Sequence, residues 1–144
     1  MSHSIEILHP AFIDLYWEEM LPHIDKVVEV SNYEFTADSI RLRALNLNSV
    51  MVVIRNLDKK IVAVTTAEVV TYDSGLRSLL LPIIGGDGLY EWGDEWFRMM
   101  KHLAKYLNCT ELRGLAARDG WLKLLKSRGW NENHTVITYQ LNQE

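Results

Sequence analysis

The chain has 144 residues, of which 48% are hydrophobic and 24% are charged, and its formal net charge is -4. This length suits one globular domain spanning residues 1–144, and the apolar content excludes extended disorder. The longest apolar run, residues 79–84, is far shorter than the roughly 20 residues that cross a bilayer, so no membrane span is expected. The acidic balance disfavours nucleic acid as a partner. A start without a secretory signal pattern, together with a single cysteine, Cys109, favours a cytoplasmic protein.

The first half of the chain predicts a strand, several helices and a β-hairpin. Alternation of apolar residues predicts a strand over 4–8, and helical spacing follows from Pro10. Pro22 is expected to break this helix and to start a second piece over 23–31, because an interior proline removes a hydrogen bond. Thr36 is a candidate N-cap for a third helix. Two β-branched runs, 49–55 and 61–72, flank a short loop and predict an antiparallel pair.

The second half returns to strands and helices in turn. A nearly continuous apolar run predicts a central strand over 76–84, followed by a glycine-rich turn and a helix that begins near Asp94. Further elements are predicted over 110–116 (strand), 120–127 (helix) and 134–141 (strand). Gly129 occupies the position where a helix commonly ends in a left-handed residue. The order β-α-α-α-β-β-β-α-β-α-β predicts an α/β (α+β) fold with a mixed central sheet of about six strands flanked by helices.

Residues 103–130 carry a family resemblance. The strand-like TELRGLAARDGW and the helix-like LKLLKSRGW, preceded by EWGDEW, resemble the last half of the GNAT (general-control-type N-acetyltransferase) fold. The element order is similar to that fold over nearly the whole chain. More narrowly, these segments resemble GNAT-like proteins of bacteriophages. The resemblance implies acetyl-coenzyme A (acetyl-CoA) as the possible cofactor, but fold alone does not fix activity.

The resemblance also implies a phosphate-binding loop of the pattern Q/R-x-x-G-x-G/A before the long helix. Its three marked positions fall on Gly88, Glu91 and Gly93, so only the last one fits. Asp94 and Glu95 add two more carboxylates beside the expected anion site, where they would repel a pyrophosphate. An alternative cradle would use backbone groups of the preceding segment together with Gly93: Ile83, Ile84, Gly85, Gly86 and Gly88. The other interpretation of these glycines is a turn or bulge that ends a strand.

Acetyl transfer would need a general base and an acid for the leaving thiolate. Glu68 is the best candidate base, because it interrupts an apolar strand; the alternative is that it lies on the solvent face. Asp73 and His134 are further candidates. Many members of the family carry a tyrosine, which can act as the acid, at the position of Leu125, and an asparagine near Arg118. In this chain another residue would have to supply the acid. Tyr90 is the first candidate, and Tyr106 and Tyr139 are the other candidates.

The remaining distinctive residues favour structural or partner roles. Five scattered histidines give no metal-ligand spacing, so no metal site is expected. Cys109 is expected to be a core cysteine rather than a nucleophile, since it follows a helix. Trp92 is expected to be exposed beside Tyr90 and to mark an interface, and an exposed strand edge or a homodimer is the other candidate for self-association. Two functions therefore compete. One is a divergent or non-catalytic binding or assembly component of the phage type, in the host cytoplasm or the virion, and the other is an acetyl-CoA-dependent N-acetyltransferase.

Overall fold

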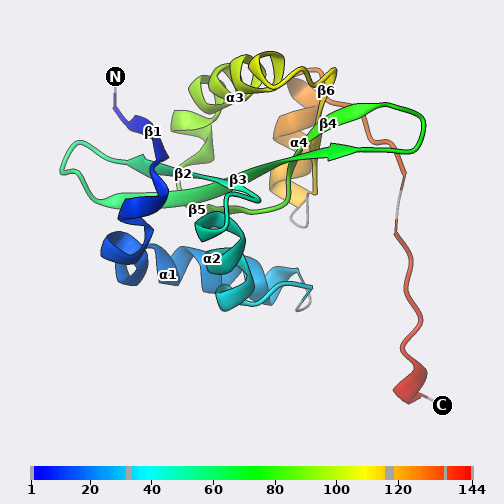
Figure 1. Cartoon of the computed structure of the whole chain (residues 1–144), viewed down its shortest axis with the longest axis horizontal. Coiled ribbons are helices and arrows are strands. Elements are labelled where there is room, and N and C mark those ends of the chain that lie inside the picture. Colours follow the sequence, from blue (N-terminus) through cyan, green and yellow to red (C-terminus); the bar gives the residue numbers. More distant parts are fainter. Residues whose placement is uncertain (1, 32–33, 116–118, 135, 144) are drawn as a thin grey trace.

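The computed structural model describes residues 2–31, 34–115, 119–134 and 136–143. Its centre is one mixed sheet in the order β1-β2-β3-β4-β6, with β5 paired to β3 (Figure 1). Among the described residues β4 and β6 form the one parallel pair, and the other pairs are antiparallel. The strands are β1 (Ser4–Leu8), β2 (Val50–Arg55), β3 (Ile61–Thr71), β4 (Arg77–Leu81), β5 (Ile84–Gly86) and β6 (Glu111–Gly114).

Helices cover both faces of the sheet. Figure 1 shows α3 on one side and α1 and α2 on the other. A short 3-10 turn (Pro10–Phe12) leads into the first of these helices, and a second one (Leu141–Gln143) lies near the end of the chain. The helices are α1 (Ile13–Val30), α2 (Ala37–Leu45), α3 (Leu89–Tyr106) and α4 (Asp119–Ser127). In the described part of the chain no helix is long and apolar enough to cross a bilayer.

The alternation of strand side chains divides the core into two layers. Met51, Val53 and Val64 pack with α1 and α2, whereas their neighbours along the same strands pack with α3. The long helix contributes a buried stripe at helical spacing to the second layer: Leu89, Trp92, Trp96, Met100 and Ala104. This double coverage explains why the runs in β2 and β3 are nearly continuous in apolar residues.

Several local predictions from the sequence are confirmed. β1 has the predicted bounds, and Thr36 caps α2 through a reciprocal bond with Ser39. The hairpin of β2 and β3 is confirmed, and Gly129 has the expected positive φ of 93°. Cys109 is buried at the junction of helix and strand, as predicted.

Three predictions of local structure are wrong. Pro22 does not divide the first helix, because α1 runs through it and buries Trp17, Met20 and Ile24 against the sheet, which outweighs the lost hydrogen bond. The strand expected over 76–84 is interrupted after Leu81 and resumes as β5. The strand expected over 134–141 does not form in the described residues, since 136–140 have no regular structure and a 3-10 turn begins at Leu141. Over the described residues the sheet still has six strands, because β5 adds a strand where the terminal one is missing.

Candidate functional site

The sheet opens where β4 passes into β5. Leu80 lies opposite Glu68 and Ile84 lies opposite Thr65, so the β4–β5 segment advances four residues while β3 advances three. One extra residue therefore forms a bulge around Pro82, which has no N–H to donate to a ladder. On the other side, β6 pairs with β4 as far as Gly114, which lies opposite Leu81. Beyond that point β5 pairs with β3 alone among the described residues.

This opening leaves an exposed backbone edge on β5. Ile83 accepts a hydrogen bond from the Thr66 N–H at 2.9 Å, and Asp87 donates one to the Val62 carbonyl at 3.0 Å. Because backbone groups alternate along a strand, Ile84 and Gly86 direct their N–H and C=O groups away from β3. These two residues offer an extended ligand the hydrogen bonds of a short strand edge.

The side chains of this segment belong to the core. Ile83 is buried in the layer of α1 and α2, and Ile84 packs against the layer of α3. A Cβ on Gly85 would lie 2.2 Å from Val27 Cγ2, and one on Gly86, whose φ is 135°, would lie 2.4 Å from the Ala63 Cα. These two glycines are therefore required by close packing, and a ligand would meet only the backbone here.

The phosphate loop expected from the resemblance is much shorter than predicted. α3 begins at Leu89, so only Asp87 and Gly88 separate it from β5. Gly88 has a φ of 83° and serves as the N-cap without a side-chain hydrogen bond. The predicted helix start at Asp94 is wrong by five residues, and Gly93 lies within the helix instead of in a loop.

Trp92 is a buried residue near the start of α3. Its side chain is only 1% exposed and its indole Nε1 donates a 2.8 Å hydrogen bond to the Asp87 carbonyl. The ring also contacts Trp96 in an edge-to-face arrangement with 6.2 Å between centroids. The prediction of an exposed Trp92 at an interface is therefore wrong, because the earlier start of α3 places this residue on the buried stripe.

The carboxylates near the helix start are not equivalent. Glu91 lies in the first turn and approaches His3 Nε2 at 3.8 Å. Asp94 lies farther along and accepts a 3.0 Å hydrogen bond from Arg128 Nε, which lowers the pKa of that carboxyl and raises the pKa of the guanidinium. Asp87 and Glu91 therefore remain as the carboxylates closest to the positive end of α3.

Glu68 lies on the face covered by α1 and α2, next to the bulge. Its side chain is 12% exposed, and Oε2 accepts hydrogen bonds from Arg43 Nε at 3.1 Å and Nη2 at 2.6 Å. The alternative that Glu68 lies on a solvent-exposed face is therefore wrong, because Arg43 of α2 covers its side chain. An amine could transfer a proton to Oε2 only after Arg43 moved away.

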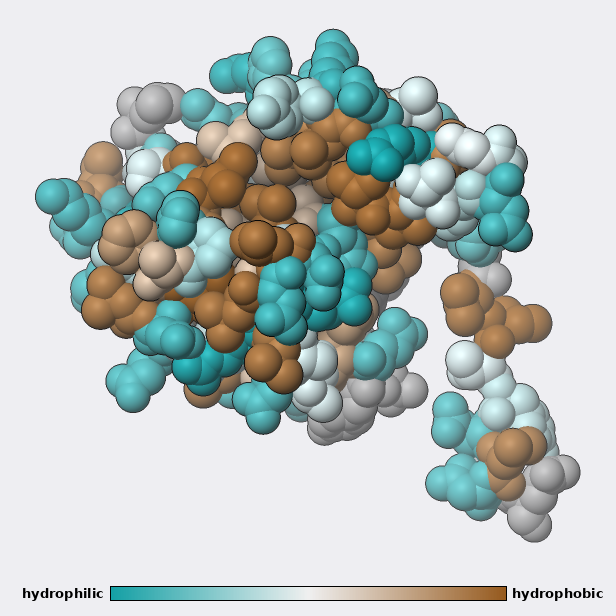
Figure 2. All heavy atoms as spheres, in the orientation of Figure 1, coloured by the Kyte–Doolittle hydropathy of each residue, from teal (hydrophilic) through white to brown (hydrophobic). Residues whose placement is uncertain are grey.

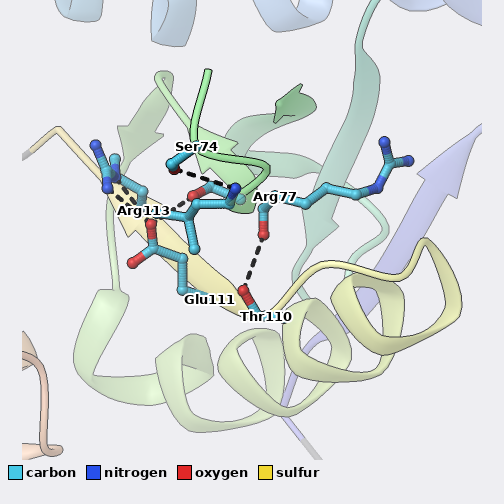
Figure 3. A network of polar contacts seen from close by, with 7 residues as sticks. Ser74, Arg77, Thr110, Glu111 and Arg113 are labelled. Atoms are coloured by element: carbon cyan, nitrogen blue, oxygen red, sulfur yellow. Dashed lines mark hydrogen bonds and ion pairs between the residues drawn. The ribbon is translucent and has the colours of Figure 1, made fainter. Parts of the chain in front are cut away.

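A second polar cluster, formed by Ser78, Glu111 and Arg113, lies on the same face and was not predicted from the sequence. Ser78, which is fully buried, donates a 2.5 Å hydrogen bond to Glu111 Oε1. Arg113 Nη2 donates a second one to the same oxygen at 2.8 Å (Figure 3). The Ser78 hydrogen bond, ahead of Arg113, lowers the pKa of the Glu111 carboxyl. The register places Glu68, Leu80 and Arg113 in one row across three strands. The available sequence signal was a serine within the strand predicted over 76–84, directly before the apolar run 79–84, but its partner depended on the strand pairing.

The other predicted groups do not meet at this site. Tyr90 is 77% exposed on α3, which covers the face opposite to Glu68, and Tyr106 and Tyr139 are also exposed. Leu125 is buried. Arg118 lies outside the described residues, and within the described part of the chain neither Asp73 nor His134 forms a hydrogen bond or an ion pair with Glu68. Within the described part of the chain, no three His, Cys, Asp or Glu residues are grouped so that they could hold a metal ion.

Comparison with known proteins connects this geometry to one fold. The sequence matches no protein-family model and no curated protein. Among solved structures, a GNAT family acetyltransferase of Staphylococcus aureus is 11% identical with a TM-score of 0.66, covering 98% of this chain and 100% of that chain. A mutant Bacillus halodurans protein is 12% identical with a TM-score of 0.76, covering 96% and 99%. An aminoglycoside acetyltransferase from a soil metagenomic sample, crystallised with sisomicin, is 15% identical with a TM-score of 0.70, covering 96% and 94%.

These comparisons confirm the predicted fold class. The described residues form a mixed α/β fold with an open six-stranded sheet and helices on both faces, as in GNAT acetyltransferases. Identities this low establish a likeness of fold, and activity has to be argued from the site.

Proposed function

We propose that this GNAT-fold chain is a divergent, non-catalytic protein of the kind found in bacteriophages, which acts in the cytoplasm as a binding or assembly component. The observation that carries this proposal is the two-residue connection between β5 and α3. A pyrophosphate is commonly held by several successive backbone N–H groups of a glycine-rich loop at a helix start. Asp87 and Gly88 are too few to form such a loop, and the Asp87 N–H is already bonded to Val62.

Charge at the helix start supports the same proposal. The N-terminus of α3 carries the positive end of the helix dipole, which favours an anion. Asp87 and Glu91 place carboxylates at this end, and like charges there disfavour a pyrophosphate. The acetyl-CoA site of the fold is therefore degenerate in this chain.

The groups needed for transfer are also poorly placed. Transfer requires the amine nitrogen to attack the thioester carbonyl, the C–S bond to break, and protons to pass from the amine to a base and from an acid to the thiolate. Glu68 is ion-paired with Arg43, Tyr90 lies on the helix that covers the other face of the sheet, and Leu125 has no proton to donate. No pair of these residues supplies both proton transfers.

An acetyl-CoA-dependent N-acetyltransferase is the second candidate, and one observation favours it. The bulge at Pro82 leaves the backbone edge of Ile84 and Gly86 free, and Ile84 lies opposite Thr65, three residues along β3 from Glu68. In this alternative the β5 edge would hold the amide-bearing arm of the cofactor, the α3 N-terminus would face the phosphates, and Glu68 would accept the amine proton after Arg43 is displaced.

Isothermal titration of acetyl-CoA and of free coenzyme A into the full chain separates the two functions. We expect no saturable binding up to about 1 mM, which corresponds to less than about 4 kcal/mol of binding free energy. A micromolar Kd would overturn the degenerate-site proposal. Such binding would be assigned to the β5 edge if it were abolished by Ile84→Pro, which removes the outward N–H, and retained by Ile84→Ala. Amine acceptors would then be screened with Glu68→Gln as the control.

A further inference from the structure

The outer edge of β1 is free for another strand. Among the described residues β1 pairs with β2 alone, and Figure 1 shows it at one side of the sheet. The direction of its backbone groups follows from the hydrogen bonds of β3. Thr66 donates its N–H to the Ile83 carbonyl on one side of β3. Alternation therefore directs the backbone groups of Thr65 to the other side, toward Val52 of β2.

The same alternation continues across β2 into β1. Because Val52 bonds to β3, its neighbour Val53 directs its backbone groups toward β1, where it lies opposite Glu6. Glu6 therefore bonds to β2, whereas Ile5 and Ile7 direct their N–H and C=O groups away from the sheet. Such a row of unpaired backbone groups can bind an extended segment as an added strand.

The side chains along this edge are partly apolar. Ile5 packs against the layer of α3, and Ile7 lies on the same face of the strand and is 45% exposed. Residues directly opposite each other in paired strands place their side chains on the same face, so an added strand would set apolar side chains beside these two. Figure 2 shows hydrophobic and hydrophilic atoms interspersed on the side of the molecule where β1 lies. The edge therefore suits a segment that carries both kinds of side chain.

Two exposed carboxylates flank the edge. The Glu6 side chain lies on the other face of β1 and is 52% exposed. One of its oxygens is bonded to Arg55, and the other accepts no hydrogen bond from a described residue. Glu91 of α3, whose side chain is 65% exposed, approaches His3, which directly precedes β1. Both carboxylates favour a cationic side chain on the segment that pairs here.

A cavity at the start of β1 has the same charge. It has a volume of about 420 Å³, and His3 lines it together with three carboxylates, those of Asp58, Asp87 and Glu91. No lysine or arginine is among the described residues that line it. A long basic side chain from an added strand, placed next to His3, therefore finds an acidic environment.

We propose that the outer edge of β1 binds an extended basic segment of a partner protein. The partner's apolar side chains lie opposite Ile5 and Ile7, and a lysine or arginine between them lies opposite Glu6. A further basic side chain lies opposite His3, beside Glu91. A second copy of this chain fits less well, because its net charge is also -4 and pairing of two β1 strands about Glu6 sets like charges opposite each other. This inference rests on the proposed role as a binding component and does not involve coenzyme A.

Fluorescence polarisation with a labelled peptide tests the proposal. The probe Lys-Thr-Val-Lys-Val-Thr-Lys, blocked at both ends, carries the assigned pattern in either chain direction. We expect saturable binding to the full chain at low salt, with a Kd below about 1 mM. Two control peptides are expected not to bind: one has glutamate in place of lysine, and the other has proline in place of valine, which keeps the charge but prevents pairing. No saturable binding of the probe, or equal binding of either control, would overturn the proposal.

Variants of the chain locate the binding. Ile7→Pro removes an outward N–H and keeps the hydrogen bonds to β2, whereas Ile7→Ala shortens the same side chain and keeps that N–H. We expect the Kd of Ile7→Pro to be at least about tenfold higher than that of Ile7→Ala, with circular dichroism showing that both are folded. Equal Kd values for the two would show that β1 is not the binding edge.

A second comparison tests the charge. Glu6→Gln is expected to weaken binding of the probe, whereas Glu132→Gln, at an ion pair of similar exposure with Lys126, is expected to leave it unchanged. Equal effects of the two variants would contradict the pairing of Glu6 with a basic side chain. Failure of the peptide to bind would leave the degenerate cofactor site untouched, because the acetyl-CoA titration tests that site separately.

Discussion

The Arg43 guanidinium donates two hydrogen bonds to one carboxylate oxygen of Glu68, from Nε at 3.1 Å and from Nη2 at 2.6 Å. This contact joins α2 to β3 beside the bulge that opens the sheet. The carboxylate is 12% exposed, so its partner compensates for lost hydration. The same contact engages the carboxylate that the sequence predicts as the general base.

Removal of Arg43 is therefore expected to destabilise the fold. Arg43→Ala leaves the Glu68 carboxylate buried without its partner, which costs about 1–3 kcal/mol in the free energy of unfolding. Lys126→Ala, at an ion pair whose two side chains are about half exposed, is the matched control and is expected to change stability by about 0–1 kcal/mol. Urea unfolding monitored by tryptophan fluorescence measures both. Equal losses in the two variants would contradict the structural importance of the Glu68 pair.

Glu111 predicts an acid-sensitive contribution to stability. Its pKa is lowered in the folded state by the Ser78 hydrogen bond and by Arg113, so the stabilisation is complete above the unfolded-state pKa and is lost as pH falls through the folded value. Ser78→Ala is expected to lower stability at neutral pH. The difference from the wild type is expected to shrink as pH falls through the folded-state pKa of Glu111, because the carboxyl then becomes protonated in both proteins.

Urea unfolding of the wild type and Ser78→Ala over a series of pH values from neutral into the acid range measures this dependence. Glu111→Gln is the control, because it removes the titrating group and should show the same loss at neutral pH with a weaker pH dependence. A difference between the wild type and Ser78→Ala that stays constant with pH would show that the serine acts through packing alone.

Trp92 is expected to be a core residue. Trp92→Ala removes a buried ring and the hydrogen bond to the Asp87 carbonyl, and such truncations cost about 3–5 kcal/mol. Tyr90→Ala, two residues earlier in the same turn, removes an exposed ring and is expected to change stability by less than about 0.5 kcal/mol. Chemical denaturation compares them. A small effect at Trp92 would mean that α3 starts later, near Asp94, with Trp92 outside the core.

Gly85 and Gly93 are expected to respond in opposite ways to alanine. In Gly85→Ala the new Cβ meets Val27 Cγ2 at 2.2 Å and the His23 carbonyl oxygen at 2.7 Å, so α1 must shift at a cost of about 1–3 kcal/mol. In Gly93→Ala the new methyl group meets the end of the flexible Leu89 side chain, which can move aside. The higher helix propensity of alanine then adds up to about 1 kcal/mol to the free energy of unfolding. Thermal unfolding of the two variants checks this order. A destabilised Gly93→Ala would argue that Gly93 lies in a loop rather than within α3.

The sequence by itself determined the fold class and most elements. Local rules were sufficient at three places: alternation predicted the bounds of β1, Thr36 was predicted as the N-cap of α2, and Gly129 was predicted to be left-handed. The β-branched runs around residues 56–60 identified the hairpin. In each case neighbours in the chain supplied the deciding interaction.

Only the tertiary structure decided the candidate site. Pro22 remains inside α1 and Trp92 inside the buried stripe because burial against the sheet outweighs local preference. The Arg43–Glu68 and Ser78–Glu111 contacts join residues 25 and 33 positions apart, so they exist only once the strand register is fixed. The terminal segment has the alternation of a strand, but pairing requires an edge. No local rule specifies whether that edge comes from the same chain or from another.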